Sequence, residues 1–272
     1  MRGLEGKVAI VTGGAASIGR AITEAFRGAG ARVVVAARSQ EQGEAIEAEL
    51  QPNVVFQRTD ITDDGDLDRL IHRAIATFGQ LDFLVNNACS YLDTGQRSTR
   101  TEWLTTLNTN LVSAALLGER ARPEIARQKG AMVNISSISA YSAQTGRWTY
   151  PASKAALLHL MRLQALDYAK DGIRVNTLVA GWTQSQPIDS LSGGDLEKAD
   201  RVAAEFHLLG RLGRATEVAR GVLFLCSDEA SFITGGELKV DGGYLTMGPE
   251  QSGAAIAKLT GTSDRATPGG SP

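Results

Sequence analysis

The strongest constraint on the fold is a regular alternation of short apolar runs with longer amphipathic stretches. Residues 7–12 form a short β-rich run that precedes a helical pattern over residues 18–29, and a second run over 31–37 precedes a helical pattern that reaches residue 50. This alternation is typical of parallel β/α units, in which each strand is followed by a helix that crosses back over the sheet.

The same alternation continues to residue 240. Further strands are predicted over residues 54–58, 81–86, 131–136, 174–179 and 237–240, and further helices over 64–78, from near Thr101, after Tyr150 and over about 216–227. The strands read as unbroken apolar runs, which are typical of strands covered on both faces. We therefore expect an α/β protein with a doubly wound Rossmann fold, in which about seven parallel strands carry helices on both faces.

The chain divides by composition into a domain and a tail. Its 272 residues include 43% hydrophobic side chains, enough for a full core, and we expect a single Rossmann-fold domain over residues 1–248. Residues 249–272 are rich in Gly, Ala, Ser, Thr and Pro, which predicts a low-complexity C-terminal tail that is disordered or loosely docked. Residues 184–200 are rich in Ser, Gly and Asp, so they are read as a surface loop or as a mobile lid over the active site.

Charge and cysteine content limit the classes of partner. The 28 basic and 30 acidic residues give a formal charge of −2, without the positive excess of a nucleic-acid binder, so nucleic acid is not expected as a partner. The apolar run near the N-terminus is too short for a signal peptide or a membrane span, which predicts a cytoplasmic protein with no membrane partner. Cys89, Cys226 and the three histidines lack metal-ligand spacing, so we expect no metal site and ordinary buried thiols.

A glycine-rich turn follows the first strand and leads into a helix. Gly13 permits a tight turn, Gly19 permits close packing of helix on sheet, and the free amides at the helix start attract a pyrophosphate. Ser17 stands where a second glycine would let the backbone approach the phosphates. Its β-carbon crowds them, or its hydroxyl donates a hydrogen bond instead.

The end of the second strand bears on the choice of cofactor. A site for NAD usually offers an Asp or Glu there for the ribose hydroxyls, whereas this chain has Ala37 followed by Arg38. A guanidinium is suited to pairing with the 2′-phosphate of NADP(H). NADP(H) is therefore favoured and NAD(H) remains possible, with the alternative that Arg38 only stacks beside the adenine or faces solvent.

A tyrosine and a lysine one helical turn apart define the candidate chemical centre. Tyr150 and Lys154 begin a helical pattern and share one face, and Ser137 ends a strand thirteen residues earlier. An ammonium near a phenol lowers the pKa of the phenol, which would make Tyr150 an acid or base near neutral pH. The hydroxyl of Ser137 is placed to hold the reacting oxygen.

Together with these motifs, several short segments give the chain a strong resemblance to the classical short-chain dehydrogenase/reductase family over about residues 7–244. The segments are the turn at 12–19, Asp60, Asn86-Asn87-Ala88, Asn110, residues 176–181 and Val240-Asp241-Gly242-Gly243. The resemblance implies the Rossmann fold, a nicotinamide cofactor and catalysis by Asn110, Ser137, Tyr150 and Lys154. It also implies a homotetramer assembled through the two long helices that begin near Thr101 and Tyr150.

The resemblance further assigns contacts with the cofactor. The residues concerned are Gly13, Ser17, Ile18, Gly19, Arg38, Asp60, Ile61, Asn87, Ala88, Tyr150, Lys154, Gly181, Thr183 and Ser185. In this assignment, Asp60 and Ile61 border the adenine, and Lys154 binds the nicotinamide ribose. Asn110 holds a water that extends a proton relay through Lys154.

Three positions depart from the family pattern, and the sequence indicates the substrate pocket less clearly than the cofactor site. Ser17 and Cys89 replace glycines and Ala180 replaces a proline, so two additional side chains lie near the cofactor. The loops at 90–96, 140–148 and 182–191 would form the pocket. Their aromatic residues, Tyr91, Tyr141, Trp148 and Trp182, indicate an apolar or ring-bearing substrate or, equally, packing in the core or between subunits.

These patterns favour an oxidoreductase that transfers a hydride between NADP(H) and a secondary alcohol or ketone, with Tyr150 as general acid/base. The first alternative is an NAD-dependent alcohol dehydrogenase of the same family. The second is a non-catalytic dinucleotide-binding sensor or scaffold. An extended-type epimerase of nucleotide sugars is disfavoured, because such enzymes usually need a larger C-terminal substrate region.

Overall fold

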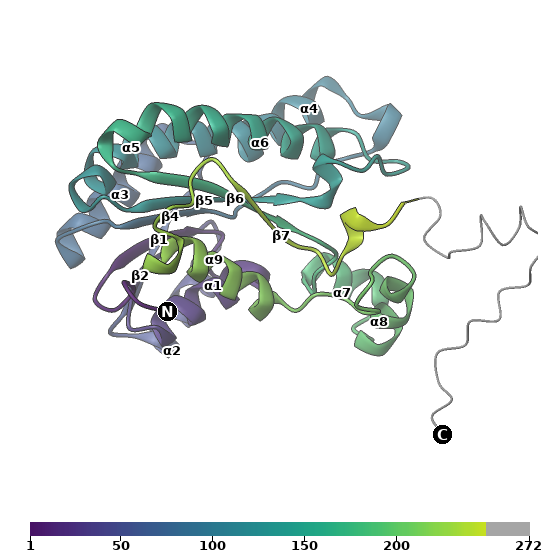
Figure 1. Ribbon diagram of the computed structural model, residues 1–272, viewed down its shortest axis with the longest axis horizontal. Helices are drawn as coiled ribbons and strands as arrows, with labels where there is room; N and C mark the ends of the chain where they lie inside the picture. Colours follow the sequence, from purple (N-terminus) through teal and green to yellow (C-terminus); the bar gives the residue numbers. More distant parts are fainter. Residues whose placement is uncertain (249–272) are drawn as a thin grey trace, which may run out of the picture.

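The computed structural model describes residues 1–248, which contain a single sheet of seven strands (Figure 1). The strands lie in the order β3-β2-β1-β4-β5-β6-β7, and every neighbouring pair is parallel. Their bounds are β1 Val8–Thr12, β2 Arg32–Ala37, β3 Val54–Arg58, β4 Phe83–Asn86, β5 Ala131–Ser137, β6 Arg174–Ala180 and β7 Glu237–Val240. The predicted fold class is confirmed, while the predicted tail at 249–272 lies outside the described residues.

Helices cover both faces of the sheet, as Figure 1 shows. One face carries α1 (Ser17–Gly28), α2 (Gln40–Leu50) and α9 (Ala215–Cys226). The other face carries α3 (Asp64–Phe78), α4 (Arg100–Leu107), α5 (Ser113–Gln128) and α6 (Thr149–Tyr168). A π-helical turn, Asn108–Val112, joins α4 to α5.

Of the two interpretations of residues 184–200, the plain surface loop was wrong, and the mobile lid stays a prediction. This stretch contains α7 (Gln186–Ser192) and enters α8 (Leu196–Ala204). Its Asp and Gly residues act as helix ends: the carboxylate of Asp195 accepts a hydrogen bond from the amide of Lys198 at 2.9 Å, and Gly193 ends α7 with φ of +70°. Residues that are common in loops here begin and end two short helices.

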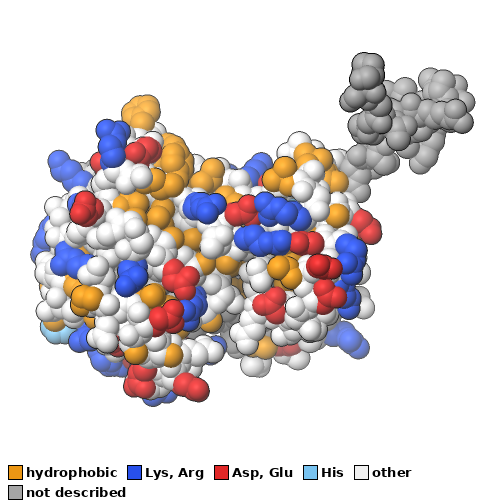
Figure 2. Space-filling model, turned by 90° about the horizontal axis from the view of Figure 1, so that it is seen from below, with side chains coloured by type: hydrophobic (Ala, Val, Ile, Leu, Met, Phe, Trp, Pro, Cys, Tyr) orange, Lys and Arg blue, Asp and Glu red, His pale blue; other side chains and the backbone are white. Residues whose placement is uncertain are grey.

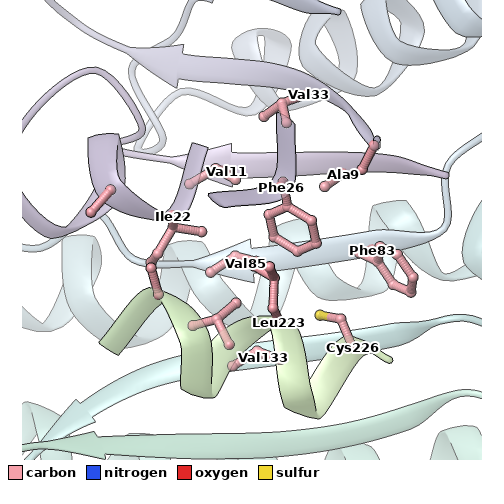
Figure 3. Packing of buried hydrophobic residues seen from close by; sticks show 14 of the residues in the cluster. Ala9, Val11, Ile22, Phe26, Val33, Phe83, Val85, Val133, Leu223 and Cys226 are labelled. Atoms are coloured by element: carbon pink, nitrogen blue, oxygen red, sulfur yellow. The ribbon is translucent and has the colours of Figure 1, made fainter. Parts of the chain in front are cut away.

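Packing of apolar side chains between the sheet and α1 and α9 forms one of the two large cores (Figure 3). Phe26 of α1 stacks on Phe83 of β4 with ring centroids 5.9 Å apart. Cys226 at the end of α9 lies in the same core, where burial raises the pKa of its thiol to about 12. The expectation of an ordinary buried thiol is confirmed for Cys226, whereas Cys89 is only half-buried.

The strand order places β1 beside β4 at the centre of the sheet, so the chain winds outward in opposite directions on either side of this pair. The connections that follow β1 and β4 therefore diverge to opposite faces, leaving a crevice at the carboxyl ends of the strands. This crevice is where ligands bind in open α/β sheets, and it holds the site described below.

Three observations bear on possible partners and ligands. Within residues 1–248, the helices are all too short or too polar to cross a bilayer. On the face shown in Figure 2, Lys and Arg side chains lie among Asp and Glu side chains and do not form one continuous positive patch. Those same described residues contain no group of three His, Cys, Asp or Glu side chains arranged to hold a metal ion.

Candidate active site

A cavity of about 1100 Å³ opens at the carboxyl ends of the central strands. Of the predicted cofactor contacts, it is lined by Gly13, Ser17, Ile18, Gly19, Arg38, Asp60, Ile61, Asn87, Ala88 and Ser185. The structure therefore brings the phosphate turn, the end of β2 and the segment after β4 around one space. Cys89 and Tyr91 also line it, on the side nearest the chemical centre.

The glycine turn after β1 has the geometry that the sequence predicts. Gly13 has φ of +65°, and a β-carbon on Gly19 would lie 2.0 Å from the carbonyl oxygen of Gly13. The turn is tied to the end of β4, because the amide of Asn87 donates from Nδ2 to the carbonyl of Thr12 at 2.9 Å. Glycine is thus required at both positions, once for the backbone angle and once for space.

Ser17 has a role that neither sequence alternative included. Its φ is +49°, in the left-handed region that favours glycine. Its hydroxyl oxygen accepts a hydrogen bond from the backbone N–H of Gln186 at 3.0 Å. The serine therefore links the phosphate turn to the first residue of α7, across the mouth of the cavity.

Arg38 lies exposed at the end of β2, where it borders both the main cavity and an adjoining hollow of about 500 Å³. Ser39 and Gln42 line the same hollow. Within the described residues, the Arg38 guanidinium has no hydrogen bond or ion pair. The carboxylate of Asp60, in contrast, is engaged locally, since it accepts from the amide of Thr62 at 3.0 Å.

Tyr150 is the second residue of α6 and is 7% exposed. The expectation that its pKa is lowered was wrong: burial raises the pKa of this phenol, and the neighbouring hydroxyls of Ser137 and Tyr91 lower it only in part. The physical reason is that desolvation disfavours the phenolate. The Lys154 ammonium lies 5.6 Å from the centre of the Tyr150 ring.

Lys154 is buried one turn further along the same face of α6, as its spacing predicts. Its Nζ donates to the carbonyl oxygen of Ile135 in β5 at 2.8 Å. Burial lowers the pKa of Lys154, because it has a backbone oxygen and no carboxylate as its hydrogen-bond partner. The lysine is thus held between α6 and β5, the strand that carries Ser137.

Ser137 is the last residue of β5 and faces Tyr150 across the start of α6. Its hydroxyl donates to the hydroxyl of Ser139 at 3.1 Å and accepts from the amide of Ser139 at 3.2 Å. These bonds orient a hydroxyl group beside the phenol. Ser137, Tyr150 and Lys154 are therefore gathered as the sequence predicts.

Asn110 lies in the π-helical turn and is buried. Its Oδ1 accepts from the amide of Ser90 at 2.6 Å, and its Nδ2 donates to the carbonyl of Ser90 at 3.0 Å and to the hydroxyl of Ser153 at 2.9 Å. Both amide hydrogens are thus used inside the protein. A cavity of about 10 Å³ lies between Asn110 and Lys154, about the minimum volume for one water.

Gly181 and Thr183 do not line the main cavity, and neither do Tyr150 and Lys154, although the resemblance assigned all four to the cofactor. A β-carbon on Gly181 would lie 2.8 Å from the Cα of Asp241, so glycine is needed for close packing after β6. Thr183 is buried, and its hydroxyl donates to the carbonyl of Gly181 at 3.1 Å. Both residues shape the segment that leads to Ser185.

Two residues in the segment after β4 were not recognised as contacts of Tyr150. The ring of Tyr91 stacks on that of Tyr150, with centroids 4.8 Å apart and planes 23° apart. The carboxylate of Asp93 accepts a hydrogen bond from the Tyr150 amide at 3.1 Å. No local pattern signals either contact, because the partners are more than fifty residues apart in sequence.

Comparison with known proteins agrees with this geometry. Residues 13–245 match a family described as enoyl-(acyl carrier protein) reductase. The chain is 38% identical to L-fucose dehydrogenase of Oryctolagus cuniculus, covering 90% of this chain and 87% of the relative. It is 35% identical to the 3-oxoacyl-[acyl-carrier-protein] reductase FabG of Escherichia coli (strain K12), covering 89% of this chain and 99% of the relative.

The chain belongs to the short-chain dehydrogenase/reductase family. It is accordingly an oxidoreductase of a family that uses nicotinamide cofactors. A solved structure of 7 alpha-hydroxysteroid dehydrogenase, complexed with NADH and 7-oxo glycochenodeoxycholic acid, shares the fold with a TM-score of 0.82 and 32% identity. That alignment covers 88% of this short-chain dehydrogenase/reductase and 94% of the solved chain.

Proposed function

We propose that the protein transfers a hydride between NADP(H) and a secondary alcohol or ketone, with Tyr150 as general acid/base. The observation that carries this proposal is the buried Tyr150 phenol, which lies near Lys154 and stacks on Tyr91, a residue that lines a cavity of dinucleotide size. The residues around the cavity fit such a group, because a glycine turn and a helix start face the space where a pyrophosphate would lie.

The nicotinamide ring supplies or accepts the hydride when the cofactor is bound. Ser137 orients the substrate oxygen through its hydroxyl. A tyrosine phenol is protonated at neutral pH and can give its proton to a carbonyl oxygen. Because burial raises the pKa of Tyr150, this step needs the nearby Lys154 ammonium to stabilise the phenolate that forms. Lys154, the water-sized cavity and Asn110 form the route by which the proton is replaced.

The choice of NADP(H) rests on Arg38. Its exposed guanidinium borders the hollow beside the phosphate turn, and no carboxylate stands at this strand end to hold the ribose hydroxyls of NAD. A 2′-phosphate would receive charge-assisted hydrogen bonds there. The runner-up is an NAD-dependent dehydrogenase of the same family, which is supported by the relative that binds NADH.

The substrate class follows from the chemical centre and from the relatives together. The named relatives act on a sugar, an acyl thioester and a steroid, and the last of these is itself named as a hydroxysteroid dehydrogenase. Exposed Tyr91 and Trp148 favour a ring-bearing substrate near Tyr150. We therefore propose a ring-bearing secondary alcohol or its ketone.

We also propose a homotetramer located in the cytoplasm. The outer faces of α5 and α6 expose leucine side chains to solvent: Leu116 is 39% exposed, Leu163 48% and Leu166 76%. Apolar patches of this kind mark protein interfaces. Sedimentation analysis of the purified chain tests the assembly.

The function is tested by titrating the protein with NADPH and with NADH, and by assaying L-fucose oxidation and the reduction of acetoacetyl-coenzyme A and a 7-oxo bile acid. We expect NADPH to bind at least about tenfold more tightly, or about 1.4 kcal/mol. Tyr150→Phe should bind cofactor as the wild type does and lose turnover. Turnover by this variant equal to that of the wild type would refute the mechanism. Tighter binding of NADH than of NADPH would refute the cofactor choice. Binding of cofactor by the wild type without turnover of any substrate would support the alternative of a non-catalytic dinucleotide-binding sensor or scaffold.

A further inference from the structure

The N-terminus of α6 is capped by a side chain from another part of the chain. Trp148, the residue that precedes the helix, offers no side-chain cap. The carboxylate of Asp93 takes that place: it accepts from the amide of Trp148 at 2.8 Å and from the amide of Tyr150 at 3.1 Å. The first turn of α6 is thus held by a residue 55 positions away from Trp148 in sequence.

This cap matters because Tyr150 lies in the turn that it holds. The first amides of a helix have no partner within the helix, and a helix end without a cap frays. A carboxylate at this end is favoured by charge-assisted hydrogen bonds and by the helix dipole. Loss of the cap would release the backbone of the residue that carries the reacting phenol.

The charge state of Asp93 suits this role. Burial raises the pKa of this half-buried carboxyl group, but hydrogen bonds from the amides of Trp148, Gly95 and Tyr150 outweigh burial and lower it overall. The group is therefore ionised at neutral pH and acts only as an acceptor. Gly95 closes the loop on the other side, its amide donating to Asp93 at 3.0 Å.

The 90–93 segment that carries Asp93 is itself fixed at both ends. The side chain of Asn110 bonds to the backbone of Ser90 at 2.6 Å and 3.0 Å. The carbonyl oxygen of Leu92 accepts from the hydroxyl of Thr149, the first residue of α6, at 2.6 Å. Tyr91 lies between these anchors, and its ring covers that of Tyr150.

We propose that the 90–93 segment is a clamp for the catalytic tyrosine and that Asp93 is its principal positioning residue. Asp93 fixes the backbone of Tyr150 at the start of α6, and Tyr91 fixes its ring from above. The bonds from Asp93 to α6 go to backbone amides, so we infer that it acts on the chemistry through the position of Tyr150. This inference rests on the proposed function of Tyr150.

Asp93→Ala removes the cap. Asp93→Asn has the same shape but keeps only one of the two oxygens that accept backbone amides, because its NH2 group is a donor. Asp195→Ala is a matched control, because Asp195 caps α8 through the amide of Lys198 and α8 does not line the cavity. Each loss of a cap is expected to lower the melting temperature by about 2–4 °C. The control thus reproduces the structural cost at a helix that carries no reacting group.

Three quantities are measured for each variant: amide hydrogen exchange over residues 148–150, the dissociation constant of NADPH, and kcat with the best of the three substrates named above. Asp93→Ala should speed exchange, leave the dissociation constant within about twofold and lower kcat by about 10- to 100-fold. Asp93→Asn should give a kcat between those of Asp93→Ala and the wild type, because it keeps one of the two acceptor oxygens. Asp195→Ala should change none of the three.

Unchanged exchange in Asp93→Ala would overturn the assignment of the cap. Faster exchange with wild-type kcat would overturn the positioning role. A parallel loss of kcat in Asp195→Ala would show that lower stability alone explains the effect, and would also overturn it. If the wild-type protein shows no turnover, the proposed function fails, and hydrogen exchange alone still decides whether Asp93 holds the start of α6.

Discussion

The two ends of the active-site crevice are built in opposite ways. At the end of β2, the group proposed to select the cofactor is Arg38, an exposed side chain without a partner among the described residues. At the end of β5, Tyr150 and Lys154 are 7% and 3% exposed and are fixed by neighbouring strands and loops. A substitution of Arg38 should therefore cost little folding stability. A substitution of Tyr150 or Lys154 should instead break a buried network of contacts.

Lys154→Met should give the largest effect of the variants that test this contrast. Methionine keeps the volume of the side chain but removes the ammonium that bonds to Ile135, so turnover should fall by about 10²- to 10⁴-fold. Steady-state kinetics measures the loss. Turnover near that of the wild type would show that the buried end of the crevice does not depend on this lysine.

The same variant has a defined effect on stability against pH. Burial lowers the pKa of Lys154 below its ordinary value of 10.5, so the unfolded chain binds more protons than the folded one. The free energy of unfolding of the wild type should therefore rise with pH between the folded pKa and 10.5. Denaturant unfolding should find this slope reduced in Lys154→Met, and an unchanged slope would contradict it.

Arg38→Asp should alter cofactor choice with little change in stability. Loss of the guanidinium and gain of an acceptor for ribose hydroxyls should weaken NADPH binding by about 10- to 100-fold and strengthen NADH binding. Fluorescence titration with both cofactors measures the switch. Arg58→Asp, at the exposed end of β3, is the charge-matched control. An equal change in the two dissociation constants in that variant would show that net charge, and not the position of Arg38, determines cofactor choice.

Ser17→Gly should give the smallest effect, and in the stabilising direction. Glycine adopts the φ of +49° without strain, which should stabilise the fold by about 0.5–1 kcal/mol. Ser17→Ala removes the hydrogen bond to Gln186 but keeps the strained backbone, so it separates the two contributions. Thermal unfolding of both variants is the measurement, and a destabilised Ser17→Gly would mean that the link to α7 outweighs the strain.

Sequence patterns predicted the parts of the site that depend on local order. The glycine turn, each strand end and the Tyr150–Lys154 pair are formed by residues close together in sequence. Apolar periodicity and short motifs were therefore sufficient to predict them. The raised pKa of Tyr150 and the cap from Asp93 depend instead on burial and on contacts between distant segments. The helices α7 and α8 were missed because they are only seven and nine residues long and lie in a stretch rich in Ser, Gly and Asp, whose composition is typical of loops.

The π-helical turn at Asn108–Val112 makes the chemical centre sensitive to chain length. It inserts one extra residue between α4 and α5, and in a helix each residue turns the backbone by about 100°. Deleting one residue here would leave a continuous helix but would rotate Asn110 away from Ser90 and Ser153. A substitution along this helix changes one side chain at a time. A change in the length of the helix would instead move Asn110 relative to two other segments at once, namely the loop that carries Tyr91 and the helix that carries Tyr150.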